Sequence, residues 1–328
     1  MHRPNLDEFE LIARYLAPLA RGESGAFGLL DDAAILDIVP GQRLVATADA
    51  LIEGVHFFPG DPPELIGRKL LRVNLSDLAA MGAVPFAYLL TMALRDEATA
   101  DWVEAFARGL GVDQKIFSVT LIGGDTTATN GPIALSATAL GYVSLNGGLR
   151  RSGARAGDRV FVSGTIGDGA MGLKVLTKKL RGLGKDDRDY LKHRFRLPEP
   201  RVALGQRLQG IASAAIDVSD GLAGDLGHIC VASGVGAVIE VARVPLSAAA
   251  RHAVGTDPQL LETVVAGGDD YEMLFMAPAD RTDEIVTVAS ESGVPVTEIG
   301  SVEIGQGVTL LGKDGSPIEL ESHGYKHF

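Results

Sequence analysis

Aspartates recur in short stretches of small residues in this sequence. Their carboxylate groups could bind divalent cations. The segment DVSDGLAGDLG, residues 217–227, carries three aspartates and no Lys or Arg. Aspartates in similar contexts stand in LLDDAAIL, ATADALIEGVHF, NLSDLAAMGA, IGGDTT and AGGDDYEMLF. A buried carboxylate is costly unless it is paired, and carboxylate oxygens are ligands that hard cations prefer. Because Mg²⁺ commonly shares its coordination shell with water and substrate phosphates, the pattern predicts Mg²⁺ together with a nucleotide.

Helix capping and turn formation are the structural alternative for any single aspartate, since Asp favours both positions. On that ground Asp31 and Asp225, each taken alone, are interpreted as structural. Capping does not explain the whole set. Asp49 follows a β-like run, Asp77 lies within the apolar pattern of a helix, and Asp125 follows a double glycine.

Two glycine-rich segments could let the backbone approach a ligand. IGGDTT, residues 122–127, also offers two hydroxyl groups. SGTIGDGAMGL, residues 163–173, resembles a strand, loop and helix start that cradles a phosphate. It lacks the Lys and Ser/Thr of a Walker loop and the spacing of a dinucleotide fingerprint. A tight turn that leads into a helix, with no role in phosphate binding, is therefore an equally weighted interpretation.

Two basic residues have a functional and an ordinary interpretation. His56, between Val55 and two phenylalanines and seven residues after Asp49, is either a packing residue or a catalytic one. Arg151, with Arg150 before it, either reaches a nucleotide phosphate or is solvated.

Alternating helix and strand patterns position these residues and predict an α/β protein. The first half is expected to form helices at 5–20, 63–81 and 100–110 and strands at 43–48, 86–94, 117–122 and 133–143. The second half is expected to form strands at 159–163, 237–241, 271–276 and 294–301 and helices at 171–180 and 201–213, with a solvated loop at 178–189. The Gly-, Ser- and Arg-rich segment 144–158 predicts a boundary between domains 1–148 and 149–328.

Composition excludes several classes of protein. The chain has 328 residues, 46% of them apolar and 22% charged, which is typical of folded globular proteins. Its net charge of −12 argues against nucleic acid as a partner, because such binders need a basic face. No apolar run approaches the roughly 18 residues that suggest a membrane span. Cys230 is the single cysteine and cannot form an internal disulfide, so we expect a cytoplasmic protein.

The motifs together resemble the thiamine-monophosphate kinase family. DDAAIL, TADALIEGVHF, LLRVNLSDLAAMGAVP, LIGGDTT, RSGARAGDRVFVSGTIGD, AIDVSDGLAGDLGHI, GGDDYEMLF and GYKHF follow one another in the family's order, from about Glu8 to Phe328. The resemblance implies a two-domain fold of the AIR-synthetase (PurM-like) type with mixed sheets. Its N-terminal domain would bind ATP and Mg²⁺ and form a barrel-like interface with a second subunit, and its C-terminal domain would be α/β. The implied activity uses ATP and several Mg²⁺ ions to convert thiamine monophosphate into thiamine diphosphate in a homodimer.

The same resemblance assigns roles to individual residues and assigns none to a catalytic side chain. It implies metal ligands at Asp32, Thr47, Asp49, Asp77, Asp125, Asp217 and Asp220. It implies nucleotide contacts at Gly124, Asp125, Arg151 and Ser219, and substrate contacts at His56, Asp269 and Ser322.

Four positions depart from the family pattern. Ala48 replaces a hydroxyl residue, so that only its backbone carbonyl could be a ligand there. Asp269 stands where Glu is usual and has a shorter reach. Ser322 takes a position that holds a ring-packing Trp in some members, and Ala128 replaces a common Arg after GGDTT. These changes bear on recognition of the thiamine ring rather than on the phosphate and metal groups.

The residues also fit the chemistry of phosphoryl transfer. Bringing two polyanions together requires positioning and neutralisation of charge more than covalent participation by the protein. We therefore expect direct in-line transfer with the substrate phosphate as nucleophile. That phosphate is largely ionised near neutral pH, so a strong general base is not required.

Other functions remain as alternative interpretations of the sequence. A second ATP-dependent enzyme of the same superfamily, such as aminoimidazole ribonucleotide synthetase, is disfavoured by the motif set. Selenophosphate synthetase needs an N-terminal Cys or selenocysteine and the hydrogenase-maturation enzyme a C-terminal Cys, whereas Cys230 is internal. A non-catalytic metal-binding protein would be expected to carry compact 12-residue calcium loops, D-x-[DN]-x-[DN]-G-x₅-E, which this sequence lacks.

Overall fold

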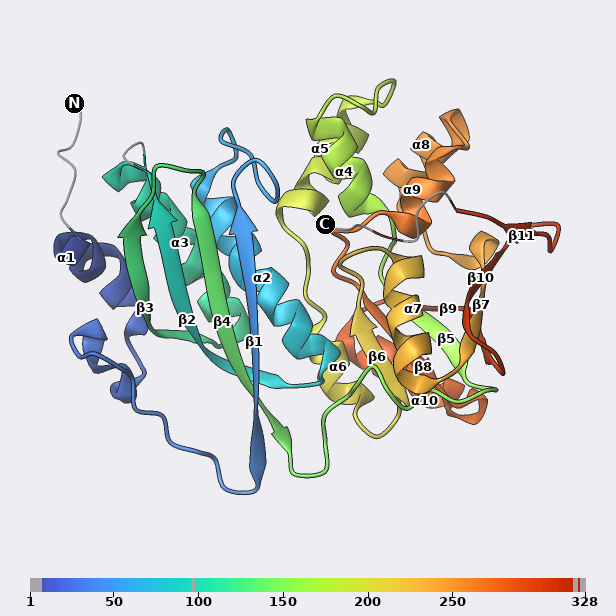
Figure 1. Ribbon diagram of the computed structural model, residues 1–328, viewed down its shortest axis with the longest axis horizontal. Coiled ribbons are helices and arrows are strands. Elements are labelled where there is room, and N and C mark those ends of the chain that lie inside the picture. Colours follow the sequence, from blue (N-terminus) through green and yellow to red (C-terminus); the bar gives the residue numbers. More distant parts are fainter. Residues whose placement is uncertain (1–7, 96–97, 321–323, 325–328) are drawn as a thin grey trace. The chain divides into compact units, whose positions relative to one another are not determined.

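The computed structural model describes residues 8–95, 98–320 and 324, which form two compact units (Figure 1). The first unit comprises residues 1–78 and 84–146, and the second comprises residues 79–83 and 147–328. The break after Asn146 falls close to the predicted boundary after residue 148. Sequence patterns did not indicate that the short segment 79–83 groups with the second unit.

A four-stranded sheet forms the centre of the first unit. Its strands lie in the order β1 (Gln42–Ile52), β4 (Ala134–Ser144), β2 (Val84–Leu94) and β3 (Thr120–Ala128). The β1–β4 and β4–β2 pairs are antiparallel, whereas β2 and β3 are parallel. Helices α2 (Pro63–Ala80) and α3 (Ala100–Phe117) lie along one face of the sheet (Figure 1). Along β2, Leu90 and Met92 are buried while Leu89 and Thr91 are exposed, so one face is covered and the other is open.

The N-terminal segment differs from the continuous helix that we predicted over residues 5–20. From residue 8 it forms α1 (Glu8–Leu11), the π-helical turn η1 (Ile12–Leu16) and the 3₁₀ turn η2 (Ala17–Ala20), followed by η3 (Ser24–Leu29). Pro18 explains part of the difference, because a proline has no N–H to continue the α-helical hydrogen bonding.

Two further boundaries correct the sequence prediction. Residues 117–119 are not strand, because α3 continues to Phe117 and is capped by Ser118, which has a left-handed φ of 55°. Part of the predicted loop 178–189 is helical, since α5 (Lys185–Arg196) begins inside it. Acidic residues in the first turn of α5 and basic residues in its last turn suit the helix dipole.

A seven-stranded sheet forms the centre of the second unit, and helices cover both faces. The strand order is β11 (Pro317–Ile318), β10 (Gly307–Leu311), β7 (Gly236–Glu240), β9 (Val296–Glu303), β5 (Arg159–Ser163), β8 (Met273–Ala277) and β6 (Ala214–Asp217). Only the β7–β10 pair is parallel in this sheet, within the part of the chain that the structure describes.

Strand β5 shows how this sheet contributes to two hydrophobic cores, one on each face. Val160 and Val162 join one core, and Phe161 between them joins the other. The first core includes residues of α4 (Asp168–Leu176), α7 (Leu222–Ser233), α8 (Ala248–Thr256) and α9 (Leu260–Ala266). The second includes residues of α6 (Val202–Leu208) and α10 (Thr282–Ser292). The alternation along β5 is the two-residue period of a strand that is buried on both faces.

None of the helices described here is long and apolar enough to cross a membrane.

Candidate active site

Strand β1 and helix α2 bring two of the predicted metal ligands together. Thr47 and Asp49 alternate with Ala48 along β1, so their side chains share one face of the strand. The Thr47 hydroxyl donates to Asp77 Oδ2 on α2 at 2.5 Å. Thr47, Asp49 and Asp77 are all half-buried, which leaves their oxygens partly accessible to a ligand.

Asn74 on α2 holds the backbone of Asp49, a role that the sequence analysis missed. Its Oδ1 accepts a hydrogen bond from the Asp49 N–H at 3.0 Å, and its Nδ2 donates to the Leu70 carbonyl at 2.9 Å. Ser136 of β4 donates to the Asp49 carbonyl at 3.0 Å. The one sequence signal was that Asn74 lies almost one helical turn before Asp77, on a neighbouring part of the helix surface.

Gly124 and Asp125 lie on β3, away from β1. Gly124 has a φ of +154°, and a Cβ there would overlap the Leu90 carbonyl of β2, so only glycine fits. Asp125 is exposed and pairs in register with Thr91. Two strands lie between β1 and β3. Three inter-strand spacings put Asp125 roughly 14 Å from Asp49, measured across the strands. The structure therefore does not bring these two carboxylates to one ion.

Asp32 is exposed in the chain between η3 and β1. Among the described residues it has no hydrogen bond or ion pair to the other predicted ligands. The structure thus places it in the same unit as Thr47 and Asp77 but does not assemble it with them.

His56 lies in the turn that follows β1, with a defined hydrogen-bonding arrangement. Its Nδ1 accepts from the Ile52 N–H at 3.0 Å, so a neutral imidazole carries its proton on Nε2. Its carbonyl accepts from Nζ of Lys69, which is only 2% exposed, at 3.0 Å. The turn therefore fixes both the tautomer of His56 and the path of its backbone.

Asp217 and the loop after it carry the predicted ligands of the second unit. Asp217 ends β6 and is buried, whereas Ser219 and Asp220 are half-buried. Oδ2 of Asp225 accepts from the N–H groups of Ser219, Asp220 and Gly221, each at 3.1 Å. This arrangement agrees with the structural interpretation of Asp225, which holds the loop that carries Asp220. Burial raises the pKa of Asp225 to about 7, although its three backbone amide bonds lower it.

His228 is a neighbour of this loop that the sequence analysis did not identify. It is exposed on α7, and one ligand atom from each of Asp220, Asp225 and His228 lies within 4.8 Å of the others. The spacing of one helical turn between Asp225 and His228 could have signalled this proximity.

The loop before β8 brings a predicted substrate contact next to a predicted nucleotide contact. The Asp269 N–H donates to the Ser219 carbonyl at 2.8 Å, and the Tyr271 N–H donates to the Val218 carbonyl at 2.8 Å. These bonds continue the pairing of β6 with β8 past the strand ends. Asp269 and Ser219, separated by 50 residues in the sequence, are thereby adjacent.

Arg151 is exposed, and its carbonyl accepts from the Ser233 hydroxyl at 3.1 Å. The backbone of this loop is thus attached to the end of α7, while the side chain faces solvent. Ser322 lies outside the described residues.

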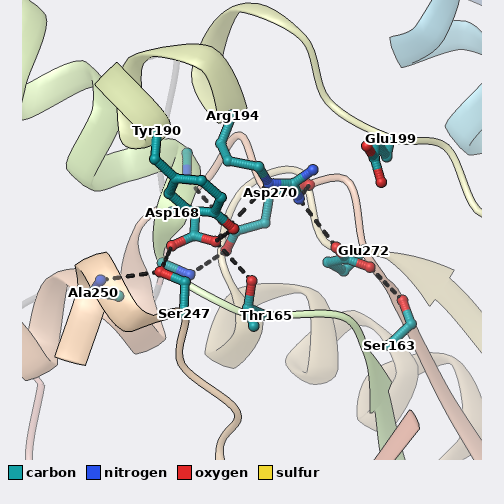
Figure 2. Close-up of polar contacts among 12 residues, drawn as sticks. Ser163, Thr165, Asp168, Tyr190, Arg194, Glu199, Ser247, Ala250, Asp270 and Glu272 are labelled. Atoms are coloured by element: carbon teal, nitrogen blue, oxygen red, sulfur yellow. Dashed lines mark hydrogen bonds and ion pairs between the residues drawn. The ribbon is translucent and has the colours of Figure 1, made fainter. Parts of the chain in front are cut away.

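Three buried carboxylates in the second unit form a polar network that sequence reasoning missed (Figure 2). Glu272, fully buried, accepts from Ser163 Oγ at 2.6 Å and from Arg194 Nη2 at 3.0 Å. Arg201 binds the same carboxylate through Nε at 2.6 Å and Nη2 at 2.5 Å. Glu272 is therefore paired and hydrogen-bonded, as a buried charge requires.

Asp168 occupies the other side of the network (Figure 2). It accepts from Thr165 at 2.7 Å, from Tyr190 at 3.1 Å and from Ser247 at 2.6 Å. Burial is the main cause that raises the pKa of Tyr190, and the charge of Asp168 adds to it.

Asp270, the third buried carboxylate, decides the role of the glycine-rich turn. Its two carboxyl oxygens accept from the N–H of Gly167 at 2.6 Å and of Gly169 at 2.9 Å. These amides at the start of α4 are therefore engaged by the protein's own side chain. The structure favours the tight-turn interpretation of residues 163–173 over a phosphate cradle.

Comparisons with known families define the class of protein. Residues 30–143 match the N-terminal domain of AIR synthase related protein, and residues 155–313 match its C-terminal domain. The chain is thus a two-domain protein of the AIR synthase related class, with the mixed α/β fold expected from the sequence.

Similar proteins narrow the class to one family. Thiamine-monophosphate kinase of Caulobacter vibrioides is 42% identical over 318 residues, which cover 95% of this chain and 89% of the relative. The crystal structure of thiamine-monophosphate kinase from Stenotrophomonas maltophilia K279a has a TM-score of 0.84 and 42% identity, with coverage of 95% of this chain and 98% of that one. AaThiL complexed with AMPPCP and TMP has a TM-score of 0.78 and 32% identity over 93% of this chain and 98% of its own. The chain belongs to the thiamine-monophosphate kinase family of enzymes.

Proposed function

We propose that this chain transfers the γ-phosphoryl group of ATP to thiamine monophosphate, which yields thiamine diphosphate and ADP. One observation carries the proposal: AaThiL, complexed with the ATP analogue AMPPCP and with TMP, matches 93% of this chain in structure. The alternative activity of aminoimidazole ribonucleotide synthetase is disfavoured, because relatives that are 42% identical to this chain are thiamine-monophosphate kinases.

Oxygen atoms supply all the proposed metal ligands. The first unit offers Asp32, Thr47, Asp49, Asp77 and Asp125, and the second offers Asp217 and Asp220. An all-oxygen set of carboxylates and one hydroxyl fits Mg²⁺. Several ions are proposed rather than one, since Asp49 and Asp125 lie on strands that are too far apart along the sheet to share an ion. When bound, Mg²⁺ would neutralise the negative charge of the phosphates.

The protein's own groups would bind and orient the two substrates. Gly124 is a proposed contact of the nucleotide on β3, and the Ser219 hydroxyl and the exposed Arg151 guanidinium would donate to its phosphates. The Nε2–H of His56 is a donor for thiamine monophosphate, because Nδ1 is engaged by Ile52. Asp269 supplies a carboxylate that suits the cationic ring of the substrate.

The proposed reaction is a direct in-line transfer. An oxygen of the substrate phosphate attacks the γ-phosphorus, the bond from that phosphorus to the β–γ bridging oxygen breaks, and ADP leaves with the electron pair. The protein contributes positioning and charge compensation, and no side chain is phosphorylated.

We propose a homodimer that works in the cytoplasm. The strands of the first unit expose apolar side chains, among them Leu44 at 46%, Val84 at 51% and Leu89 at 38%. Register places Leu44 and Val84 on either side of Tyr142 of β4. Such a surface on an open sheet face suits a second subunit, and sedimentation equilibrium measures the association directly.

An assay of ADP release with ATP and Mg²⁺ tests the proposed activity. Thiamine monophosphate, free thiamine and an aminoimidazole precursor would be compared as acceptors for the wild-type protein and Asp77→Asn. We expect turnover with the monophosphate alone and a loss of about 100-fold or more in the variant, because Asp77 is a proposed metal ligand. Turnover with a different acceptor, or full activity of Asp77→Asn, would contradict the proposal.

A further inference from the structure

The loop between α9 and β8, residues 267–272, adopts an unusual backbone. Asp269 and Tyr271 have φ values of +70° and +53°, the left-handed region that residues with a side chain rarely enter. A residue with a side chain is strained in this region and persists there only where its surroundings impose it. The two left-handed residues flank Asp270, so the contacts of Asp270 are well placed to impose this backbone.

Asp270 joins this loop to the turn before α4. The Asp270 side chain is 1% exposed, and its oxygens accept from the amides of Gly167 and Gly169. Gly169 also lies against Asp269 itself, since a Cβ at Gly169 would overlap the Asp269 carbonyl group. The Asp270 carbonyl accepts from Arg194 at 3.5 Å. One side of the loop is therefore fixed by the glycine turn.

The opposite side of the loop is fixed by the residues that follow β6. Asp269 donates to Ser219 and Tyr271 donates to Val218, through backbone bonds of 2.8 Å. Asp269 consequently lies between two anchored segments, and the Asp270 side chain attaches the loop to the turn before α4 through Gly167 and Gly169.

We propose that Asp270 is a positioning residue that sets the orientation of Asp269 toward thiamine monophosphate. The assignment rests on the proposed function of Asp269 as a substrate contact. The Asp270 carboxyl group is buried against the glycine turn, so its proposed role is indirect, through Asp269. Replacement of Asp270 should therefore weaken binding of the thiamine substrate more than binding of ATP.

Steady-state kinetics of Asp270→Asn test this assignment. The amide side chain presents an NH₂ to one of the two glycine N–H groups, so one hydrogen bond is lost and the loop shifts. We expect the KM for thiamine monophosphate to rise about tenfold or more, with the KM for ATP changed by less than about threefold. Equal changes in both KM values, or no change in either, would overturn the assignment.

Ser247→Ala is the matched control in the same network. Ser247 donates to Asp168 and caps α8 by accepting from the Ala250 N–H at 3.0 Å, so its hydrogen bonds lie outside residues 267–272. We expect a lower Tm with both KM values within about twofold of wild type. A rise in the KM for thiamine monophosphate like that of Asp270→Asn would show a general effect of instability and count against the assignment.

Gly169→Ala provides a second route if Asp270→Asn does not fold. Its Cβ displaces Asp269 without changing any charge, so the KM for thiamine monophosphate should again rise selectively. If wild type is active and the folded Gly169→Ala variant has an unchanged KM for thiamine monophosphate, the assignment is overturned while the proposed function stands. A wild-type protein that does not use thiamine monophosphate would instead overturn the proposed function, and the assignment with it.

Discussion

Two sets of carboxylates in this molecule show how the same side chain serves different purposes. In the first unit Asp49 and Asp77 are half-buried and Asp125 is exposed, at positions where a ligand can reach them. In the second unit Asp270 and Glu272 are buried and each is hydrogen-bonded by groups of the protein itself. Accessibility and the source of the hydrogen bonds, more than residue type, separate the two sets.

The comparison teaches where negative charge is available for metal ions. A buried carboxylate whose oxygens all meet protein donors has little capacity left for a cation, whereas an accessible one retains it. Substitutions in the accessible set should consequently lower activity with little loss of stability, whereas substitutions in the buried set should lower stability. Asp270, which is also proposed to position Asp269, should affect both.

Glu272→Gln should have the largest effect. The substitution leaves Arg194 and Arg201 without the carboxylate that both bind, and removing one partner of a buried ion pair costs about 3–5 kcal/mol. Urea unfolding followed by circular dichroism measures this loss.

Glu199→Gln is its control, because Glu199 binds the same Arg201 at 3.1 Å but is exposed. Exposed pairs contribute about 0–1 kcal/mol. Equal destabilisation by the two variants would remove the distinction between buried and accessible carboxylates.

Asp125→Asn should show the reverse signature. We expect kcat/KM with ATP to fall about 100-fold, which corresponds to about 2.7 kcal/mol, with the free energy of unfolding changed by less than about 0.5 kcal/mol. Asp37→Asn, at another exposed aspartate of the first unit, should leave both quantities unchanged. An active Asp125→Asn enzyme would exclude this residue from the ligand set.

A further expected effect is a pH dependence of stability from Asp270. Burial raises the pKa of Asp270 well above its usual range, and Asp168 adds to the rise, whereas the amides of Gly167 and Gly169 and the charge of Arg194 lower it. The native state therefore binds the proton more tightly than the unfolded state. This contribution to stability is complete below about pH 4 and is lost as pH rises toward the folded pKa.

Denaturant unfolding at several pH values checks the sign. Asp270→Asn removes the titrating group, so the stability of wild type minus that of the variant should fall between about pH 4 and pH 7, by at most about 1.4 kcal/mol per pH unit. A difference that rises with pH would mean that Asp270 is more acidic in the native protein.

The sequence was sufficient for the fold class and the family but not for the buried network. Helix 63–81 was predictable from the sequence pattern, and it matches α2 to within one residue. The fold was confirmed by the two matching AIR synthase related domains. The individual site residues stay predictions.

The network could not be predicted because its partners are far apart in the chain. Ser163 and Glu272 are separated by 109 residues, and Arg194 and Glu272 by 78. Short-range patterns contain no signal for such pairs. The glycine turn stayed ambiguous for the same reason, since only the folded chain brings Asp270 to its amides.

The central claim is tested most directly by ³¹P nuclear magnetic resonance of a reaction that contains the protein, ATP, Mg²⁺ and thiamine monophosphate. The account predicts that the signal of the monophosphate is replaced by the two signals of thiamine diphosphate, with one ADP formed for each. Formation of ADP and free phosphate while thiamine monophosphate stays unchanged would contradict it.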